Sequence, residues 1–136
     1  MDSLDYYNIE ELLTHEERAA RDRARRFVQE EVAPEIVPCY RAAKFPEHLI
    51  PRIGALRFYA PYLKENGCAG LSYTAYGLIM QELERADSGL RSLASVQGAL
   101  AIQAIHSFGS AEQHARCAWL VQRAVEERAQ DLIELS

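Results

Sequence analysis

Apolar residues recur along this chain at intervals of three and four, the spacing that places them on one face of an α-helix. The first such stretch covers about residues 15 to 32 and is rich in strong helix formers. Thr14 and Glu17 form a capping box at its start, because each side chain can bond the backbone N–H of the other residue. The pattern therefore predicts a long helix close to the N-terminus.

Prolines divide the next part of the chain into shorter helices. Pro34 and Pro38 cannot lie in the interior of the first helix, so we expect a bend near Ala33 and a short helix over about residues 34 to 43. Another short helix is expected after Phe45, because apolar residues follow at helical spacing. These residues are Leu49, Ile50, Ile53, Leu56 and Phe58.

The second half of the chain is more apolar and follows a loop. Residues 60 to 72 contain proline, asparagine and glycine, which are typical of a loop between elements. Residues 73 to 87 have the spacing of an amphipathic helix, after which Asp87 or Ser88 can cap a further helix over about residues 89 to 108. Apolar residues cover most of the circumference of this last helix, which is typical of a central helix.

A final helix is predicted after Gly109, which ends the preceding one. Ser110 and Gln113 supply a second capping box, and helical spacing continues to about Glu134. The chain has almost no strand signal and no internal repeat. We therefore predict an all-α fold, an irregular bundle of five or six helices that forms a single domain over residues 1–136.

The net charge and the cysteines indicate which partners and which cellular location to expect. The formal net charge of −5 does not favour nucleic acid or an anionic membrane surface, and no apolar stretch approaches the roughly 20 residues that a membrane helix needs. Cys39, Cys68 and Cys117 lie far apart without a CxxC pair, which indicates reduced thiols and a cytoplasmic location. The N-terminal residues are acidic and do not resemble a transit peptide.

Common catalytic and metal-binding motifs are missing from the sequence. The four histidines have no ligand spacing, and neither phosphate-binding glycine loops nor hydrolase motifs occur. One stripe of the predicted central helix is unusual, because Arg91, Ser95 and Gly98 fall on it with Ser92 at its edge. The arginine can bind a carboxylate there, and the serines can orient that carboxylate. Alternatively, Arg91 pairs with Asp87 or Glu84, the serines bond backbone carbonyls, and Gly98 serves helix packing.

The stretch CAGLSYTAYGLIMQELERADSGLRSLASVQGALAIQAIHSFGSAEQ resembles the N-terminal domain of acyl-CoA dehydrogenases, most of all the glutaryl-CoA dehydrogenase group. The resemblance spans about residues 5–120 and leaves residues 121–136 as a divergent helical tail. It implies that Arg91 and Ser92 help to hold the distal carboxylate of a dicarboxylyl-CoA substrate, with Ser95 and Gln97 as weaker candidates. Arg57 and Ala60 depart from the pattern, since related sequences commonly have glycine at these positions.

In that family the residues that hold FAD lie in a β-domain, and the catalytic glutamate lies in a C-terminal helical bundle. Neither segment corresponds to any part of this sequence, so we expect the chain alone to bind no flavin and to be inactive. The predicted function is the N-terminal domain of an FAD-dependent acyl-CoA dehydrogenase, which contributes the acyl-pocket wall. The alternative is a non-catalytic helical module that associates with itself through an exposed apolar patch.

Overall fold

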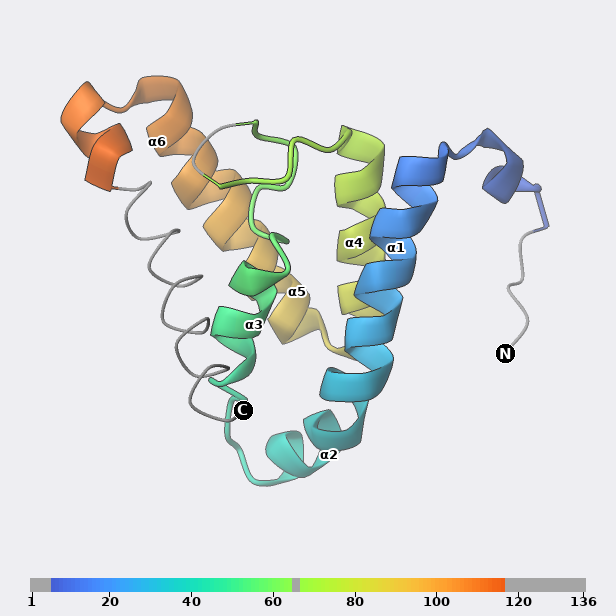
Figure 1. The fold of residues 1–136 in the computed structure, drawn as a ribbon. Helices are drawn as coiled ribbons and strands as arrows, with labels where there is room; N and C mark the ends of the chain where they lie inside the picture. Colours follow the sequence, from blue (N-terminus) through green and yellow to red (C-terminus); the bar gives the residue numbers. More distant parts are fainter. Residues whose placement is uncertain (1–5, 65–66, 117–136) are drawn as a thin grey trace, which may run out of the picture.

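The computed structural model describes residues 6–64 and 67–116, and within these residues the chain is helical and has no strand (Figure 1). The predicted all-α fold is therefore confirmed. The elements are the 3₁₀ turn η1 (Ile9–Leu12), α1 (His15–Phe27), the π-helical segment η2 (Val28–Val32), α2 (Ala33–Arg41), α3 (Leu49–Ala55), α4 (Tyr73–Ala86), α5 (Ser88–Ser95), the π-helical segment η3 (Val96–Ile102) and α6 (Gln103–Phe108). Residues 111–116 begin the predicted last helix, whose remainder lies outside the described residues.

Side chains that the sequence marks as caps begin the helices. The capping box of Thr14 and Glu17 is present, with Glu17 N–H donating to Thr14 Oγ1 at 3.2 Å and Thr14 N–H donating to Glu17 Oε2 at 2.9 Å. Of the two residues considered for the start of α5, Asp87 is the cap, because its Oδ1 accepts from Leu90 N–H at 2.7 Å. Local hydrogen bonds of this kind depend on spacing along the chain, which is why the sequence predicts them.

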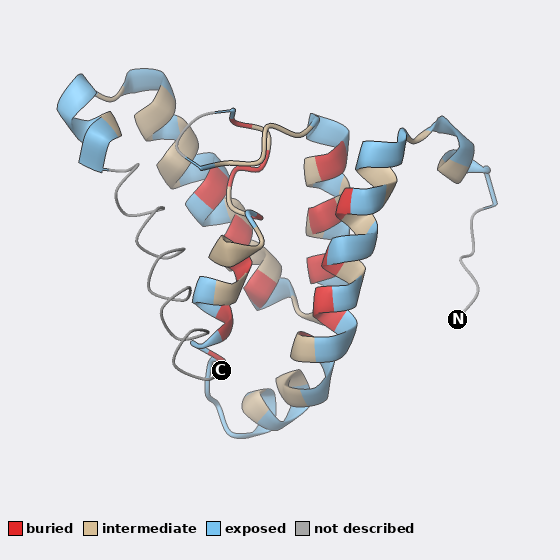
Figure 2. Ribbon diagram, in the orientation of Figure 1, coloured by how far each residue is buried: buried red, intermediate tan, exposed pale blue. Residues whose placement is uncertain are grey.

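The core lies between α1 and α4, which run side by side in the same direction (Figure 1). Their buried side chains face each other, and α3 and α5 cover the remaining side (Figure 2). The buried cluster comprises Ala20, Ala24, Phe27, Val28, Val32, Leu49, Ile53, Phe58, Ala75, Ile79, Leu83, Leu90 and Ala94. Small alanines on the facing sides of α1, α4 and α5 allow these helices to approach closely.

Glu17 joins the N-termini of α1 and α4. Besides closing the capping box, its carboxylate accepts a hydrogen bond from Ser72 Oγ at 2.6 Å, and Ser72 Oγ in turn accepts from Ala75 N–H at 3.0 Å. The hydrogen bonds from Ser72 and Thr14 lower the pKa of Glu17. The stability that the ionised Glu17 carboxylate contributes is therefore present above the ordinary glutamate pKa and is lost as the pH falls.

The long helix formed by α5, η3 and α6 corrects one sequence expectation. Leu90, Ala94 and Gly98 are buried, but Leu100 and Phe108 are 68% and 89% exposed. The helix is therefore central only in its first half. The reason is the direction of the helix, which begins beside α4 at α5 and diverges from α4 through η3 to α6 (Figure 1).

Two residues hold the left-handed backbone conformation just before the site described below. Arg57 has φ of 59° and Ala60 has φ of 43°. This conformation costs a residue with a Cβ about 1–2 kcal/mol, whereas glycine adopts it readily. Both positions therefore have a backbone conformation that favours glycine.

Candidate functional site

The structure brings two of the predicted side chains into direct contact on α5. Arg91 Nη1 donates to Ser95 Oγ at 3.3 Å, and Ser95 Oγ donates to the backbone carbonyl of Ser92 at 3.1 Å. All three residues are partly buried, whereas Gln97 is exposed. Residues four apart on a helix lie one above the other, so the contact between Arg91 and Ser95 follows from their spacing.

Glu84 at the end of α4 anchors the arginine. Arg91 Nε donates to Glu84 Oε2 at 2.6 Å, and Ser88 Oγ donates to Glu84 Oε1 at 2.6 Å. The hydrogen bonds from Arg91 and then Ser88 lower the pKa of Glu84. One of the two ion-pair partners weighed from the sequence is thus the observed one, and Asp87 is not, since it caps α5.

Gly98 continues the stripe of Arg91 and Ser95, and it meets a backbone. A Cβ built on Gly98 would lie 2.7 Å from the backbone nitrogen of Ala60, closer than real Cβ contacts come. The absence of a side chain at position 98 therefore permits the segment around Ala60 to press against η3. This observation matches the packing role that was considered for Gly98.

Tyr62 in the loop before α4 forms an aromatic cluster with Tyr73 and Tyr76 in the first turn of α4. The Tyr62 ring stacks on Tyr73 with centroids 4.8 Å apart and meets Tyr76 edge-on at 5.2 Å. Burial raises the pKa of the Tyr76 phenol, and the positive charge of Arg91 opposes that rise. The helical spacing of residues 73 to 87 does not reveal this cluster or the effect of Arg91 on Tyr76, because both depend on how α4 packs against α5 and the preceding loop.

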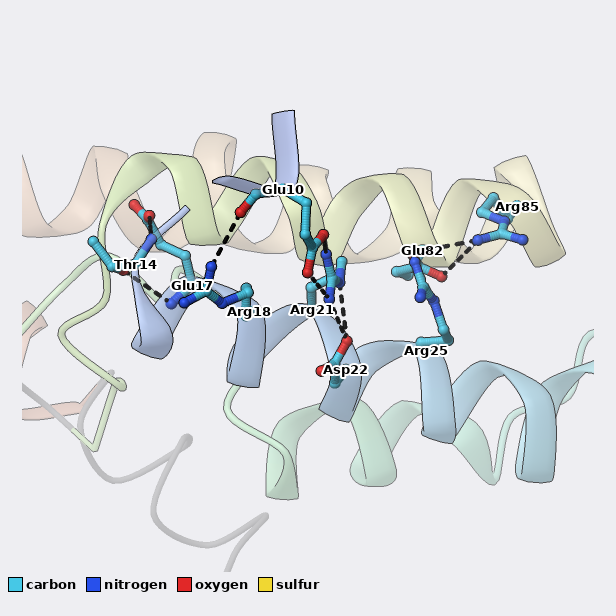
Figure 3. A network of polar contacts seen from close by, with 9 residues as sticks. All are labelled: Glu10, Thr14, Glu17, Arg18, Arg21, Asp22, Arg25, Glu82 and Arg85. Atoms are coloured by element: carbon cyan, nitrogen blue, oxygen red, sulfur yellow. Dashed lines mark hydrogen bonds and ion pairs between the residues drawn. The ribbon is translucent and has the colours of Figure 1, made fainter. Parts of the chain in front are cut away.

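A second polar cluster joins α1 to α4 (Figure 3). The Glu82 carboxylate, whose side chain is 4% exposed, accepts from Arg25 Nη2 at 2.8 Å and pairs with Arg85 Nη1 at 3.3 Å. Glu82 stands among Ile79 and Leu83 on the buried face of α4. Its two cationic partners explain how a carboxylate is tolerated there, so this cluster serves packing.

The described part of the chain offers few groups that could hold a metal or a cofactor. Residues 6–64 and 67–116 contain no group of three His, Cys, Asp or Glu side chains able to hold a metal, and no helix there is long and apolar enough to cross a membrane. The N-termini of α1 and α4 meet the Glu17 carboxylate, and that of α5 meets Asp87. Because helix N-termini bind pyrophosphate through free N–H groups, these carboxylates make the N-termini of α1, α4 and α5 a poor fit for the phosphates of FAD.

Comparisons with known sequences support the resemblance. Residues 14–126 match the family model of the acyl-CoA dehydrogenase N-terminal domain. The mitochondrial short-chain specific acyl-CoA dehydrogenase of Mus musculus is 31% identical over 109 residues, covering 79% of this chain and 26% of the relative. Benzylmalonyl-CoA dehydrogenase of Aromatoleum aromaticum is 28% identical over 101 residues, covering 74% of this chain and 27% of the relative.

Solved structures of glutaryl-CoA dehydrogenase from Mycobacterium smegmatis have the same fold over this region. One superposes with a TM-score of 0.81 at 45% identity and covers 89% of this chain and 31% of that chain. Another, in complex with FADH2, has a TM-score of 0.83 at 35% identity and covers 91% of this chain and 32% of that chain. The present chain thus spans only about a quarter to a third of its relatives.

Proposed function

We propose that this chain forms part of the wall of an acyl-CoA pocket. The chain belongs to the acyl-CoA dehydrogenase family and corresponds to its N-terminal domain. In this proposal Arg91 binds the distal carboxylate of a dicarboxylyl-CoA, and Ser92 and Ser95 help to orient it. The observation that carries the proposal is the anchoring of Arg91 by Glu84 through Nε. The similarity to glutaryl-CoA dehydrogenase supports the substrate class, since glutaryl-CoA ends in a second carboxylate.

The geometry of Arg91 suits a carboxylate ligand. Its Nε donates to Glu84, so the terminal Nη1 and Nη2 groups can together bind a carboxylate in two parallel hydrogen bonds. Glu84 holds the guanidinium in one orientation, which reduces the entropy lost on binding. The side chain of Arg91 is 35% exposed, so a ligand can reach it without a large rearrangement.

The chain alone is expected to be colourless and inactive. In the full-length relatives the flavin accepts the hydride from the acyl thioester, whereas the carboxylates at the N-termini of α1, α4 and α5 disfavour its phosphates and no catalytic glutamate is assigned here. Purified protein should show no flavin absorbance and no turnover of glutaryl-CoA with an artificial electron acceptor. A flavin spectrum that survives desalting, together with turnover, would contradict this prediction.

Arg91→Met is expected to weaken binding of glutaryl-CoA to the chain about tenfold, because charged hydrogen bonds contribute about 1.5–3 kcal/mol. Amide chemical shifts measured by NMR during titration give the affinity and locate the site at α5. Arg85→Met is the matched control. Arg85 also pairs with a carboxylate, but it lies in α4, before the junction with α5. Butyryl-CoA, which lacks the distal carboxylate, should bind both variants alike. Equal affinity of Arg91→Met and wild type for glutaryl-CoA would refute the proposal.

One observation favours the alternative function, a non-catalytic helical module. Large apolar residues along η3 and α6 are exposed: Val96, Leu100 and Phe108. Such a row is the kind of surface through which helical domains associate. Self-association stays a prediction, as does the cytoplasmic location, since the mitochondrial name belongs to the murine relative.

A further inference from the structure

Tyr76 stands on the face of α4 that also carries the anchor of Arg91. Tyr76, Met80 and Glu84 are spaced by four residues, so their side chains emerge along one side of the helix. α5 turns back from α4 after the single connecting residue Asp87 (Figure 1). Moving from Arg91 to Ser95 along α5 therefore leads from the level of Glu84 toward Tyr76.

The guanidinium of Arg91 points along this direction. Its Nε contacts Glu84, whereas its Nη1 contacts Ser95, one helical turn farther along α5. Nη1, one of the two terminal nitrogens offered to a carboxylate, thus lies on the side of the arginine that faces the N-terminal part of α4. The charge of Arg91 acts on the Tyr76 phenol, in agreement with this placement.

Neighbouring rings hold Tyr76 in place. Tyr62 meets it edge-on at 5.2 Å, and Tyr62 is itself stacked on Tyr73. The backbone before Tyr62 is pressed against Gly98 through Ala60, which ties this aromatic wall to the same stripe as Arg91. The Tyr76 side chain is half-buried, so its rotation is restricted.

We propose that Tyr76 is a specificity-determining residue whose hydroxyl donates a hydrogen bond to the carboxylate bound by Arg91. This inference rests on the proposed function and adds Tyr76 to the residues that bind the distal carboxylate. A carboxylate offers about four lone-pair sites, and two parallel bonds from arginine leave room for a phenol donor. A phenol is protonated at neutral pH, and burial raises the pKa of Tyr76 further, so the hydroxyl acts as a donor and no proton is transferred.

The test compares Tyr76→Phe with Tyr73→Phe, a matched loss of a hydroxyl from the same aromatic group at an exposed position. Tyr76→Phe should weaken glutaryl-CoA binding about fivefold, the effect of one hydrogen bond of ordinary strength, and leave butyryl-CoA binding unchanged. Tyr73→Phe should change neither. If Tyr76→Phe binds glutaryl-CoA like wild type while Arg91→Met does not, the inference fails and the proposed function stands. If wild type does not prefer glutaryl-CoA, both fail.

A spectroscopic titration tests the placement of Tyr76 separately. The ultraviolet difference between wild type and Tyr76→Phe isolates the ionisation of this phenol, and the difference between Arg91→Met and the double variant Arg91→Met with Tyr76→Phe isolates it without the arginine. Arg91→Met should raise the pKa of Tyr76, because the opposing positive charge is lost. An unchanged pKa would overturn the inference, as would an equal loss of glutaryl-CoA and butyryl-CoA binding in Tyr76→Phe, which would indicate a purely structural role.

Discussion

Gly98→Ala is expected to lower the free energy of unfolding by about 2–3 kcal/mol, the cost of inserting a methyl group into a packed interior. The added Cβ would lie 2.7 Å from the backbone nitrogen of Ala60. A flexible side chain would move aside at little cost, but this contact is with backbone that already holds a left-handed φ of 43°. The clash can be relieved only by moving η3 away from the segment around Ala60.

The chain contains a matched control for this substitution. Gly77 lies in α4, is exposed, and has no atom within 4 Å of an added Cβ. Gly77→Ala should therefore raise stability by about 1 kcal/mol, because alanine favours the helix over glycine. Urea unfolding monitored by circular dichroism measures both variants. Gly98→Ala as stable as wild type would show that η3 does not press against Ala60.

Arg25→Met is expected to lower the free energy of unfolding by about 2–3 kcal/mol, because it leaves the buried Glu82 carboxylate short of a partner. The cost falls toward the lower end of the range for broken buried pairs, since Arg25 is one-third exposed and Arg85 remains. Methionine keeps most of the packing volume, so the loss isolates the charge.

Two further variants separate this effect from general damage to α1. Arg26→Met changes the neighbouring exposed arginine and should shift stability by no more than about 0.5 kcal/mol. The double variant Arg25→Met with Glu82→Met should recover much of the lost stability, because no unpaired buried charge remains. Thermal and urea unfolding of wild type, Arg25→Met, Glu82→Met and the double variant measure the coupling. Additive losses would mean that Arg25 and Glu82 do not interact.

Helical spacing predicted some contacts of the candidate site and left others open. Arg91 and Ser95 share a helix stripe by spacing alone, and their hydrogen bond is present. The sequence left two ion-pair partners for Arg91, and the angle between α4 and α5 selects Glu84. Tyr62 and Tyr76 are fourteen positions apart across a loop, so no helical periodicity relates their rings.

The amino-acid sequence by itself determined where helices begin and which residues share a helix face. Capping boxes and i, i+4 neighbours act within one or two turns, and backbone geometry fixes their distances. Only the tertiary structure decided that Glu82 is buried beside Arg25, that Gly98 meets Ala60, and that the long apolar helix is half exposed. These contacts join residues far apart in the chain, and their formation depends on how the helices cross and how far each one extends.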